Sequence, residues 1–280
     1  MTTNPIFSCE FFPPKTDEGA VKLATTRDEL AKLNPAFFSV TYGAGGSTRE
    51  RTLDAVFAIQ DAGLQVAPHI SCIGATQDNI RELLSLYRDR GITRLVALRG
   101  DMPSGMATPG EFRYANELVA FIRSQHDDYF TIEVAAYPEF HPEASNAESD
   151  LKNFAQKIAV GADSAITQYF FNADAYFRFV DDCHGMGITV PIVPGIMPIT
   201  NSSQLIRFSD ACGAEIPRWV RRRLEGFGND RDSIRAFGLD VVTDLCRKLL
   251  DGGAPGLHFY TMNQSIPTTA IWNALELGAA

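Results

Sequence analysis

Eight short runs of β-branched and aromatic residues recur along the chain, and their spacing limits the fold more than any other feature. Most are nearly continuous in apolar residues, as is typical of parallel strands covered on both faces. Except for the last pair, their starts are roughly 25–40 residues apart, the length of one strand plus one crossover helix. The expected strands are 6–11, 37–41, 66–70, 94–99, 132–137, 165–168, 190–194 and 257–261.

Helix signals occupy the intervals between these runs. Glycine adopts the left-handed conformation that ends a helix, which predicts helix ends near Gly63, Gly91, Gly161, Gly185 and Gly252. The interval between Pro194 and Leu257 has room for two or three helices. The alternation indicates an α/β fold, a (β/α)8 TIM barrel with extra helices between the last two strands. An open doubly wound sheet is the rival, but no G-x-G-x-x-G follows an early strand.

Composition narrows the class of protein. With 34 acidic and 25 basic side chains the formal net charge is −9, which argues against a nucleic-acid or anionic-membrane partner. The five cysteines form no CxxC pair, so they indicate neither a disulfide framework nor a zinc or iron–sulfur site. The chain shows no secretory signal or long apolar run. We therefore expect a single cytoplasmic domain over residues 1–280, with no regulatory domain.

Polar side chains gather where the expected strands end. In such a barrel the catalytic groups lie at the carboxyl ends of the strands. A mouth with carboxylates, aromatics, amides and an arginine suits a large planar ligand with a charged tail. The polar residues at these positions are Glu10, Thr41, Tyr42, His69, Arg99, Asp101, Tyr137, Glu139, His141, Gln168, Tyr260, Thr261 and Asn263, with Gly100 between Arg99 and Asp101.

Motifs at these strand ends resemble those of the 5,10-methylenetetrahydrofolate reductase family, bacterial type, catalytic domain only. The similarity spans essentially the whole chain in order. It is carried by 9–14 (CEFFPP), 39–44 (SVTYGA), 67–72 (APHISC), 98–101 (LRGD), 136–143 (AYPEFHPE), 166–171 (ITQYFF), 194–198 (PGIMP) and 258–263 (HFYTMN).

The resemblance implies a flavoprotein oxidoreductase of one-carbon and methionine metabolism. Such an enzyme binds FAD, takes hydride from NADH or NADPH, and reduces 5,10-methylenetetrahydrofolate to 5-methyltetrahydrofolate. The implied partners are these small molecules and further copies of the chain in a homo-oligomer. The sequence does not distinguish NADH from NADPH.

The resemblance also assigns two catalytic residues. Glu10 matches the general acid that protonates the leaving amine of the folate. Its neighbours Phe11 and Phe12 predict an apolar setting that raises the pKa of the carboxyl. Asp101, close in sequence to Arg99, is expected to stay ionised, to bind the pterin and to tune the flavin.

The remaining implied site residues bind cofactor or substrate, and none binds a metal. Asp150, Asn153 and Lys157 are spaced to share one helix face. For FAD the residues are Thr41, Tyr42, His69, Arg99, Gly100, Asp101, Tyr114, Ala115, Tyr137, His141, Ala144, Asp150, Asn153 and Lys157. For substrate they are Asp101, Gln168, Gln204, Phe208 and Gln264, the last replacing the arginine that usually ends the final motif.

Two alternatives remain open from the residues alone. A metal-dependent hydrolase or lyase could use His69, His141 and Asp101 as ligands, although they are widely dispersed in sequence. A flavin-binding subunit could instead receive electrons from a partner protein, and Gln264 is the feature that favours it.

Overall fold

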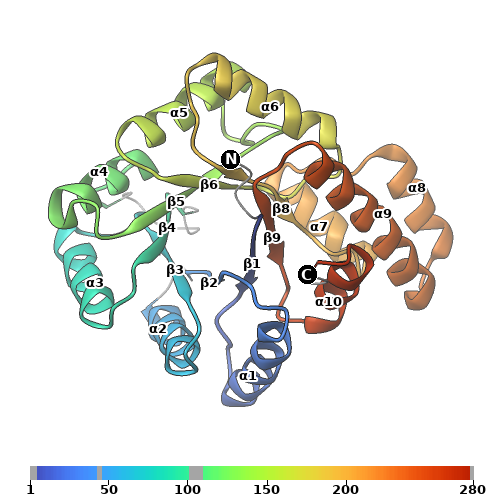
Figure 1. The fold of residues 1–280 in the computed structure, drawn as a ribbon, viewed down its shortest axis with the longest axis horizontal. Coiled ribbons are helices and arrows are strands. Elements are labelled where there is room, and N and C mark those ends of the chain that lie inside the picture. Colours follow the sequence, from blue (N-terminus) through green and yellow to red (C-terminus); the bar gives the residue numbers. More distant parts are fainter. Residues whose placement is uncertain (1–4, 43–45, 101–109, 278–280) are drawn as a thin grey trace.

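A computed structural model of the chain describes residues 5–42, 46–100 and 110–277, in which parallel strands form a ring surrounded by helices (Figure 1). The strands are β1 (Ile6–Phe11), β2 (Phe37–Val40), β3 (Val66–Ser71), β4 (Arg94–Leu98), β5 (Thr131–Ala136), β6 (Ser164–Thr167), β7 (Ile192–Val193), β8 (Gly195–Ile196) and β9 (Gly256–Tyr260). The helices are α1 (Asp17–Ala31), α2 (Gly46–Asp61), α3 (Gln77–Asp89), α4 (Ala115–His126), α5 (Ala147–Ala159), α6 (Ala173–Gly185), α7 (Ser202–Cys212), α8 (Arg218–Phe227), α9 (Arg231–Asp251) and α10 (Ser265–Ala274).

The strands follow one another around the ring in the order β7-β6-β5-β4-β3-β2-β1-β9-β8. Together β7 and β8 occupy the seventh position, which the sequence predicted as one strand. Pro194 separates them because it has no N–H to donate. Its carbonyl accepts a hydrogen bond from the His258 N–H at 3.0 Å. On one side of Pro194, β7 pairs with β6, and on the other side β8 pairs with β9, so the ring closes. The predicted (β/α)8 barrel is confirmed.

Three helices, α7, α8 and α9, lie between the last two strand positions, on the right of Figure 1. This confirms the extra helices expected there. The predicted helix ends at Gly63, Gly91, Gly161, Gly185 and Gly252 each lie within two residues of an observed end.

The inside of the ring is only partly apolar. Successive side chains of a strand point to opposite faces, so Cys9 and Phe11 belong to the core under the helices, whereas Ser8 and Glu10 point into the ring. A small cluster within the ring joins Phe37, Ala67, Val96 and Ile166. Polar side chains, among them Glu10, His69 and His258, also lie inside the ring, and they form the candidate active site.

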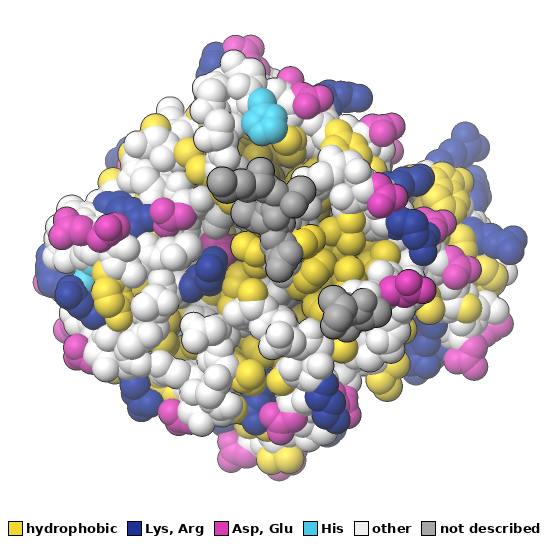
Figure 2. Space-filling model, in the orientation of Figure 1, with side chains coloured by type: hydrophobic (Ala, Val, Ile, Leu, Met, Phe, Trp, Pro, Cys, Tyr) yellow, Lys and Arg dark blue, Asp and Glu magenta, His cyan; other side chains and the backbone are white. Residues whose placement is uncertain are grey.

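The surface carries charges of both signs. On the face shown in Figure 2, Lys and Arg alternate with Asp and Glu around the periphery, while apolar side chains gather near the middle. Within the described part of the chain, no helix combines the length and apolar character needed to cross a membrane.

The contact between β1 and β9 leaves no space for a side chain at Gly256. Its φ is +154°, and a Cβ there would lie 1.7 Å from the Ile6 carbonyl oxygen. Ile6 and Gly256 are partners in the register that joins the first strand to the last. Closure of the ring therefore depends on a glycine at this position.

We predict that Gly256→Ala lowers the free energy of unfolding by at least about 2 kcal/mol, because the backbone must shift to relieve the clash. Urea unfolding followed by circular dichroism measures the loss. Gly226→Ala is the control, since a Cβ at Gly226 in α8 meets nothing within 4 Å. Equal stability of the two variants would contradict the prediction.

Candidate active site

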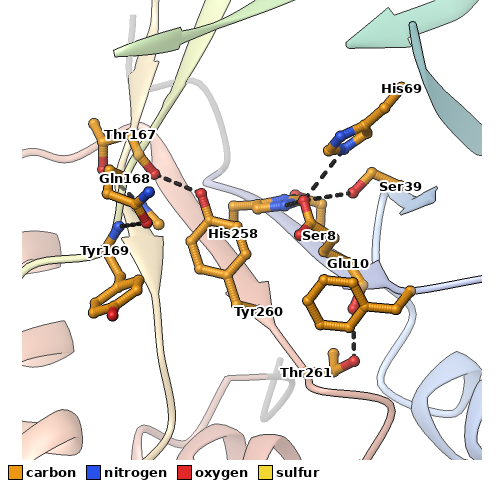
Figure 3. A network of polar contacts seen from close by, with 12 residues as sticks. Ser8, Glu10, Ser39, His69, Thr167, Gln168, Tyr169, His258, Tyr260 and Thr261 are labelled. Carbon is orange, nitrogen blue, oxygen red and sulfur yellow. Dashed lines mark hydrogen bonds and ion pairs between the residues drawn. The ribbon is translucent and has the colours of Figure 1, made fainter. Parts of the chain in front are cut away.

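A buried carboxylate with histidine neighbours lies inside the ring, near the carboxyl end of β1 (Figure 3). The Glu10 side chain is only 9% exposed. Its Oε2 lies 3.2 Å from His69 Nε2, 3.4 Å from His258 Nε2 and 3.4 Å from Ser39 Oγ. These partners come from β3, β9 and β2, so four strands converge on one carboxyl group.

The pKa of the Glu10 carboxyl is set by opposing effects. Burial raises it, but the charge of His69, together with the hydrogen bond and charge of His258, outweighs burial and lowers the pKa to about 2. The predicted raised pKa is therefore wrong. Phe11 points to the helices and packs on Phe38 with ring centroids 5.2 Å apart, and Phe12 is 41% exposed, so neither surrounds the carboxyl group.

His258 and Ser8 extend the cluster deeper into the ring. His258 is fully buried, and its Nδ1 lies 2.7 Å from Ser8 Oγ. Sequence reasoning gave neither residue a role. The period of two in a strand could have identified them, because Ser8 precedes Glu10 by two and His258 precedes the strand-end Tyr260 by two.

A second group of predicted residues lies together between β4, β5 and α5. Arg99 Nη1 pairs with Glu143 at 2.6 Å, and the Tyr137 and His141 rings pack edge to face at 4.6 Å. Asp150 accepts a bond from the His141 N–H at 3.0 Å. Burial, followed by the charge of Arg99, lowers the pKa of His141. The structure thus brings together much of the set assigned to FAD.

Lys157 is a desolvated cation on the same helix. It is half-buried, and its Nζ donates to the Ala135 carbonyl oxygen at 2.5 Å. Burial lowers the pKa of the ammonium group to about 8, although the charge of Asp150 acts in the opposite direction. An anion beside such an ammonium group would stabilise its charged form through a charge-assisted hydrogen bond.

The other residues assigned to FAD lie around this group or along the mouth. Gly100 has a φ of +83°, and a Cβ there would lie 1.9 Å from Ser71 Oγ, so only glycine fits. Asp101 lies outside the described residues. Thr41 and Tyr42 are half-buried after β2, Tyr114 is exposed before α4, Ala115 begins α4, the Ala144 N–H bonds to the His141 carbonyl, and Asn153 is exposed on α5.

The residues assigned to substrate come from several elements. Gln168 follows β6, and its Oε1 accepts the Tyr169 N–H at 3.0 Å (Figure 3). Gln204 and Phe208 are half-buried and lie four residues apart on α7, so they share one face. Gln264 is exposed immediately before α10.

An amide clamp that sequence reasoning missed holds the loop before Gln264. Asn263 Oδ1 accepts the Phe12 N–H at 2.8 Å, and Asn263 Nδ2 donates to the Phe12 carbonyl at 2.9 Å. Met262 and Asn263 both have positive φ, a conformation that asparagine tolerates better than most residues. The clamp ties the ends of the first and last strands together at the mouth.

The described residues contain no group of three or more His, Cys, Asp or Glu side chains that could hold a metal ion. His69 points to Glu10 inside the ring, whereas His141 lies on the loop after β5, where its Nδ1 accepts the Glu143 N–H. These two ligands of the metal alternative have separate partners.

The sequence is similar to those of known proteins over nearly its whole length. The family model described as "Methylenetetrahydrofolate reductase" matches residues 1–276. A Salmonella typhimurium 5,10-methylenetetrahydrofolate reductase is 42% identical over 96% of this chain and 90% of its own length. An Arabidopsis thaliana methylenetetrahydrofolate reductase (NADH) is 38% identical over 97% of this chain and 48% of its own.

A solved structure shares the fold at lower identity. It is a Clostridium thermocellum protein, described as binding two copies of 5-methyl-5,6,7,8-tetrahydrofolic acid. It matches with a TM-score of 0.71 and 16% identity, over 98% of this chain and 95% of that chain.

The lowered pKa of Lys157 predicts a pH dependence of stability. The folded-state pKa of about 8 lies below the ordinary 10.5, so between these values the unfolded chain binds more protons than the folded chain. The free energy of unfolding of the native protein, relative to Lys157→Met, should therefore rise as the pH rises through this interval. Urea unfolding at several pH values measures the difference.

Lys152→Met, which removes an exposed lysine from the same helix, corrects for the loss of one positive charge. A difference between the native protein and Lys157→Met that stays constant across the interval would contradict the prediction.

Proposed function

The chain belongs to the methylenetetrahydrofolate reductase family, and on that premise we propose that it is a flavoprotein with two half-reactions. In the first, NADH or NADPH would be oxidised, and in the second, 5,10-methylenetetrahydrofolate would be reduced to 5-methyltetrahydrofolate, with bound FAD linking the two by its hydride chemistry. The Arabidopsis relative is named as NADH-dependent, which favours NADH as the first donor to test.

The observation that carries this proposal is the buried titratable cluster around Glu10. Opening the five-membered ring of the folate breaks a carbon–nitrogen bond, and the leaving nitrogen needs a proton. Glu10 lies at a strand end within the mouth, with two imidazoles in contact with its carboxyl group. A carboxyl group that shares a proton with imidazoles can deliver that proton in a site shielded from water.

The residues present fit a flavin dinucleotide. Lys157 offers a desolvated positive charge for the pyrophosphate, and Gly100 has the positive φ that lets the chain turn after β4 with Ser71 packed against it. Arg99 and His141 lie beside them, and Asp150 carries a carboxylate that suits a ribose hydroxyl. When bound, FAD supplies the hydride chemistry, while the protein supplies position and protons.

The folate would lie over the mouth between α7 and the ends of β1 and β6. Gln168 offers an amide to the pterin edge, Phe208 offers an aromatic face, and Gln204 lies on the same helix face as Phe208. We assign Asp101 to the pterin as well. The Clostridium protein of the same fold binds a methylated tetrahydrofolate, which supports a folate as the substrate class.

The central test separates the two half-reactions. The purified protein should show the visible absorption bands of bound flavin, lose them anaerobically with NADH or NADPH, and regain them when 5,10-methylenetetrahydrofolate is added. We expect Glu10→Gln to slow the return by about 10²–10⁴-fold, the usual contribution of a general acid. Bleaching should survive, because hydride transfer to FAD needs no proton from Glu10.

Three outcomes count against this proposal in different ways. A protein without flavin would refute FAD dependence. A flavoprotein that neither nicotinamide nucleotide bleaches would support the alternative of a protein electron donor. Equal loss of both half-reactions in Glu10→Gln would refute its role as the acid.

We also predict that Lys157→Met weakens FAD binding by about 10- to 100-fold, the effect expected when a hydrogen bond to a charged group is lost. Quenching of flavin fluorescence on binding measures the affinity. Lys152→Met should retain the native affinity, since its exposed side chain pairs with Glu148. Equal weakening in both variants would indicate a general charge effect and would remove Lys157 from the site.

A further inference from the structure

We propose that His258 is a positioning residue that stores the proton delivered by Glu10, and that Ser8 holds the His258 ring in both of its charge states. The inference rests on the proposed function, because it concerns the proton used in the folate half-reaction. It adds two residues that touch neither substrate nor cofactor.

His258 is held in place on every side. It is fully buried in β9, with Nε2 3.4 Å from Glu10 Oε2 and Nδ1 2.7 Å from Ser8 Oγ (Figure 3). The Phe37 ring packs against it at 6.2 Å between centroids, and the Tyr260 ring at 5.4 Å. Each ring nitrogen therefore has one polar partner, and the ring orientation follows from these contacts.

The position of His258 separates it from His69. In the register of the sheet, His258 pairs with Ser8, two residues before Glu10 on β1. It therefore lies on the side of Glu10 that faces away from the mouth. His69 also contacts Glu10, but it is slightly exposed and belongs to the set assigned to FAD. A change at His258 can therefore alter the proton supply without altering a ligand contact.

Ser8 suits both charge states of His258. A hydroxyl group can donate one hydrogen bond and accept two. When the ring is an imidazolium, Nδ1–H donates to Ser8 Oγ and Nε2–H faces Glu10. When the ring has given up its Nε2 proton, the neutral imidazole keeps its hydrogen on Nδ1, which still donates to Ser8 Oγ. The contact with Ser8 is therefore the same in both charge states, and the proton that moves is the one between Nε2 and Glu10.

Charged and aromatic groups face His258 from three strands. Glu10 is ionised at neutral pH, since its pKa is lowered to about 2, so a carboxylate faces His258 on one side. On β5, the buried Glu133 pairs with the partly exposed Arg94 of β4, and the charges of both His258 and His69 act on Glu133. Tyr260, also on β9, packs edge to face on the His258 imidazole, and its hydroxyl donates to the Thr167 carbonyl at 2.7 Å.

The proton moves in two transfers, from His258 to Glu10 and from Glu10 to the folate. The His258 imidazolium gives its Nε2 proton to the Glu10 carboxylate and becomes neutral imidazole. Glu10, now a carboxylic acid, gives a proton to the leaving nitrogen of the folate as its carbon–nitrogen bond breaks, and that electron pair becomes the N–H bond. Glu10 returns to the carboxylate, and a proton from water restores the imidazolium before the next turnover.

The experiment follows both half-reactions of the flavin-loaded protein by anaerobic stopped flow across pH. His258→Gln keeps an N–H donor near Glu10 but cannot hold the proton. Ser8→Ala removes the hydroxyl, and Ser8→Thr restores it. Ser164→Ala is the matched control, because it removes another buried strand hydroxyl, one with no hydrogen-bond partner among the described residues.

We expect His258→Gln to slow the folate half-reaction by about 10- to 100-fold, as for loss of a charged hydrogen-bond partner, and to change its pH profile. Ser8→Ala should shift that profile, and Ser8→Thr should return it towards the native one. Bleaching by the nicotinamide nucleotide should be unchanged in all of these variants, as should both half-reactions in Ser164→Ala.

A measurement without turnover completes the test. Nitrogen-15 NMR of histidine-labelled holoprotein should show the His258 signals, assigned by their loss in His258→Gln, reporting protonation of both nitrogens in the pH range where the folate half-reaction is fast. Ser8→Ala should move that titration, and the kinetic pH profile of Ser8→Ala tests the inference even if His258→Gln does not fold.

Two results would overturn the inference. One is an unchanged pH profile in both Ser8→Ala and His258→Gln, and the other is a His258 ring that stays neutral wherever the folate half-reaction is fast. Failure of the proposed function looks different, because the native protein would then lack flavin, bleaching or reoxidation by folate.

Discussion

The carboxylate of Glu10 lies inside the strand ring, where a charge is stable only when it is paired. Its partners are imidazoles from the third and last strands and a hydroxyl from the second. Removing one partner of such a group leaves a buried charge without compensation, which destabilises the folded protein. The pairing of the strands in the ring therefore brings these groups within contact distance of one another.

Closure of the ring makes this convergence possible. His258 and Glu10 are 248 residues apart in sequence, and they meet only because β9 pairs with β1. That pairing needs Gly256 opposite the Ile6 carbonyl. On the other edge of β9, the Pro194 carbonyl accepts the His258 N–H and joins the last strand to the seventh position of the ring. The Asn263 amide then ties the same two strands together at the mouth. The fold and the proton chemistry thus depend on the same strand pair.

Much of this architecture could be predicted from the sequence, because apolar runs at regular intervals leave few folds open. The strand starts, the extra helices and the gathering of polar residues at strand ends were all predicted. The pKa of Glu10 was not, because its neighbours Phe11 and Phe12 are close in sequence but do not surround its side chain. The partners that set the pKa, His69 and His258, are distant in sequence and become neighbours only through register. Ser8 could have been found from the alternation of side chains along β1, but its role follows only from its contact with the distant His258.

The central claim is that two imidazoles, rather than an apolar pocket, control the Glu10 carboxyl group. Carbon-13 NMR of protein labelled at the glutamate carboxyl carbons tests it most directly, with the Glu10 signal assigned by its loss in Glu10→Gln. The account predicts that the Glu10 carboxyl group stays ionised from neutral pH to well below the ordinary pKa of 4.5 and titrates at about 2. A Glu10 signal that titrates above 4.5, as a lone desolvated carboxyl would, would contradict the account.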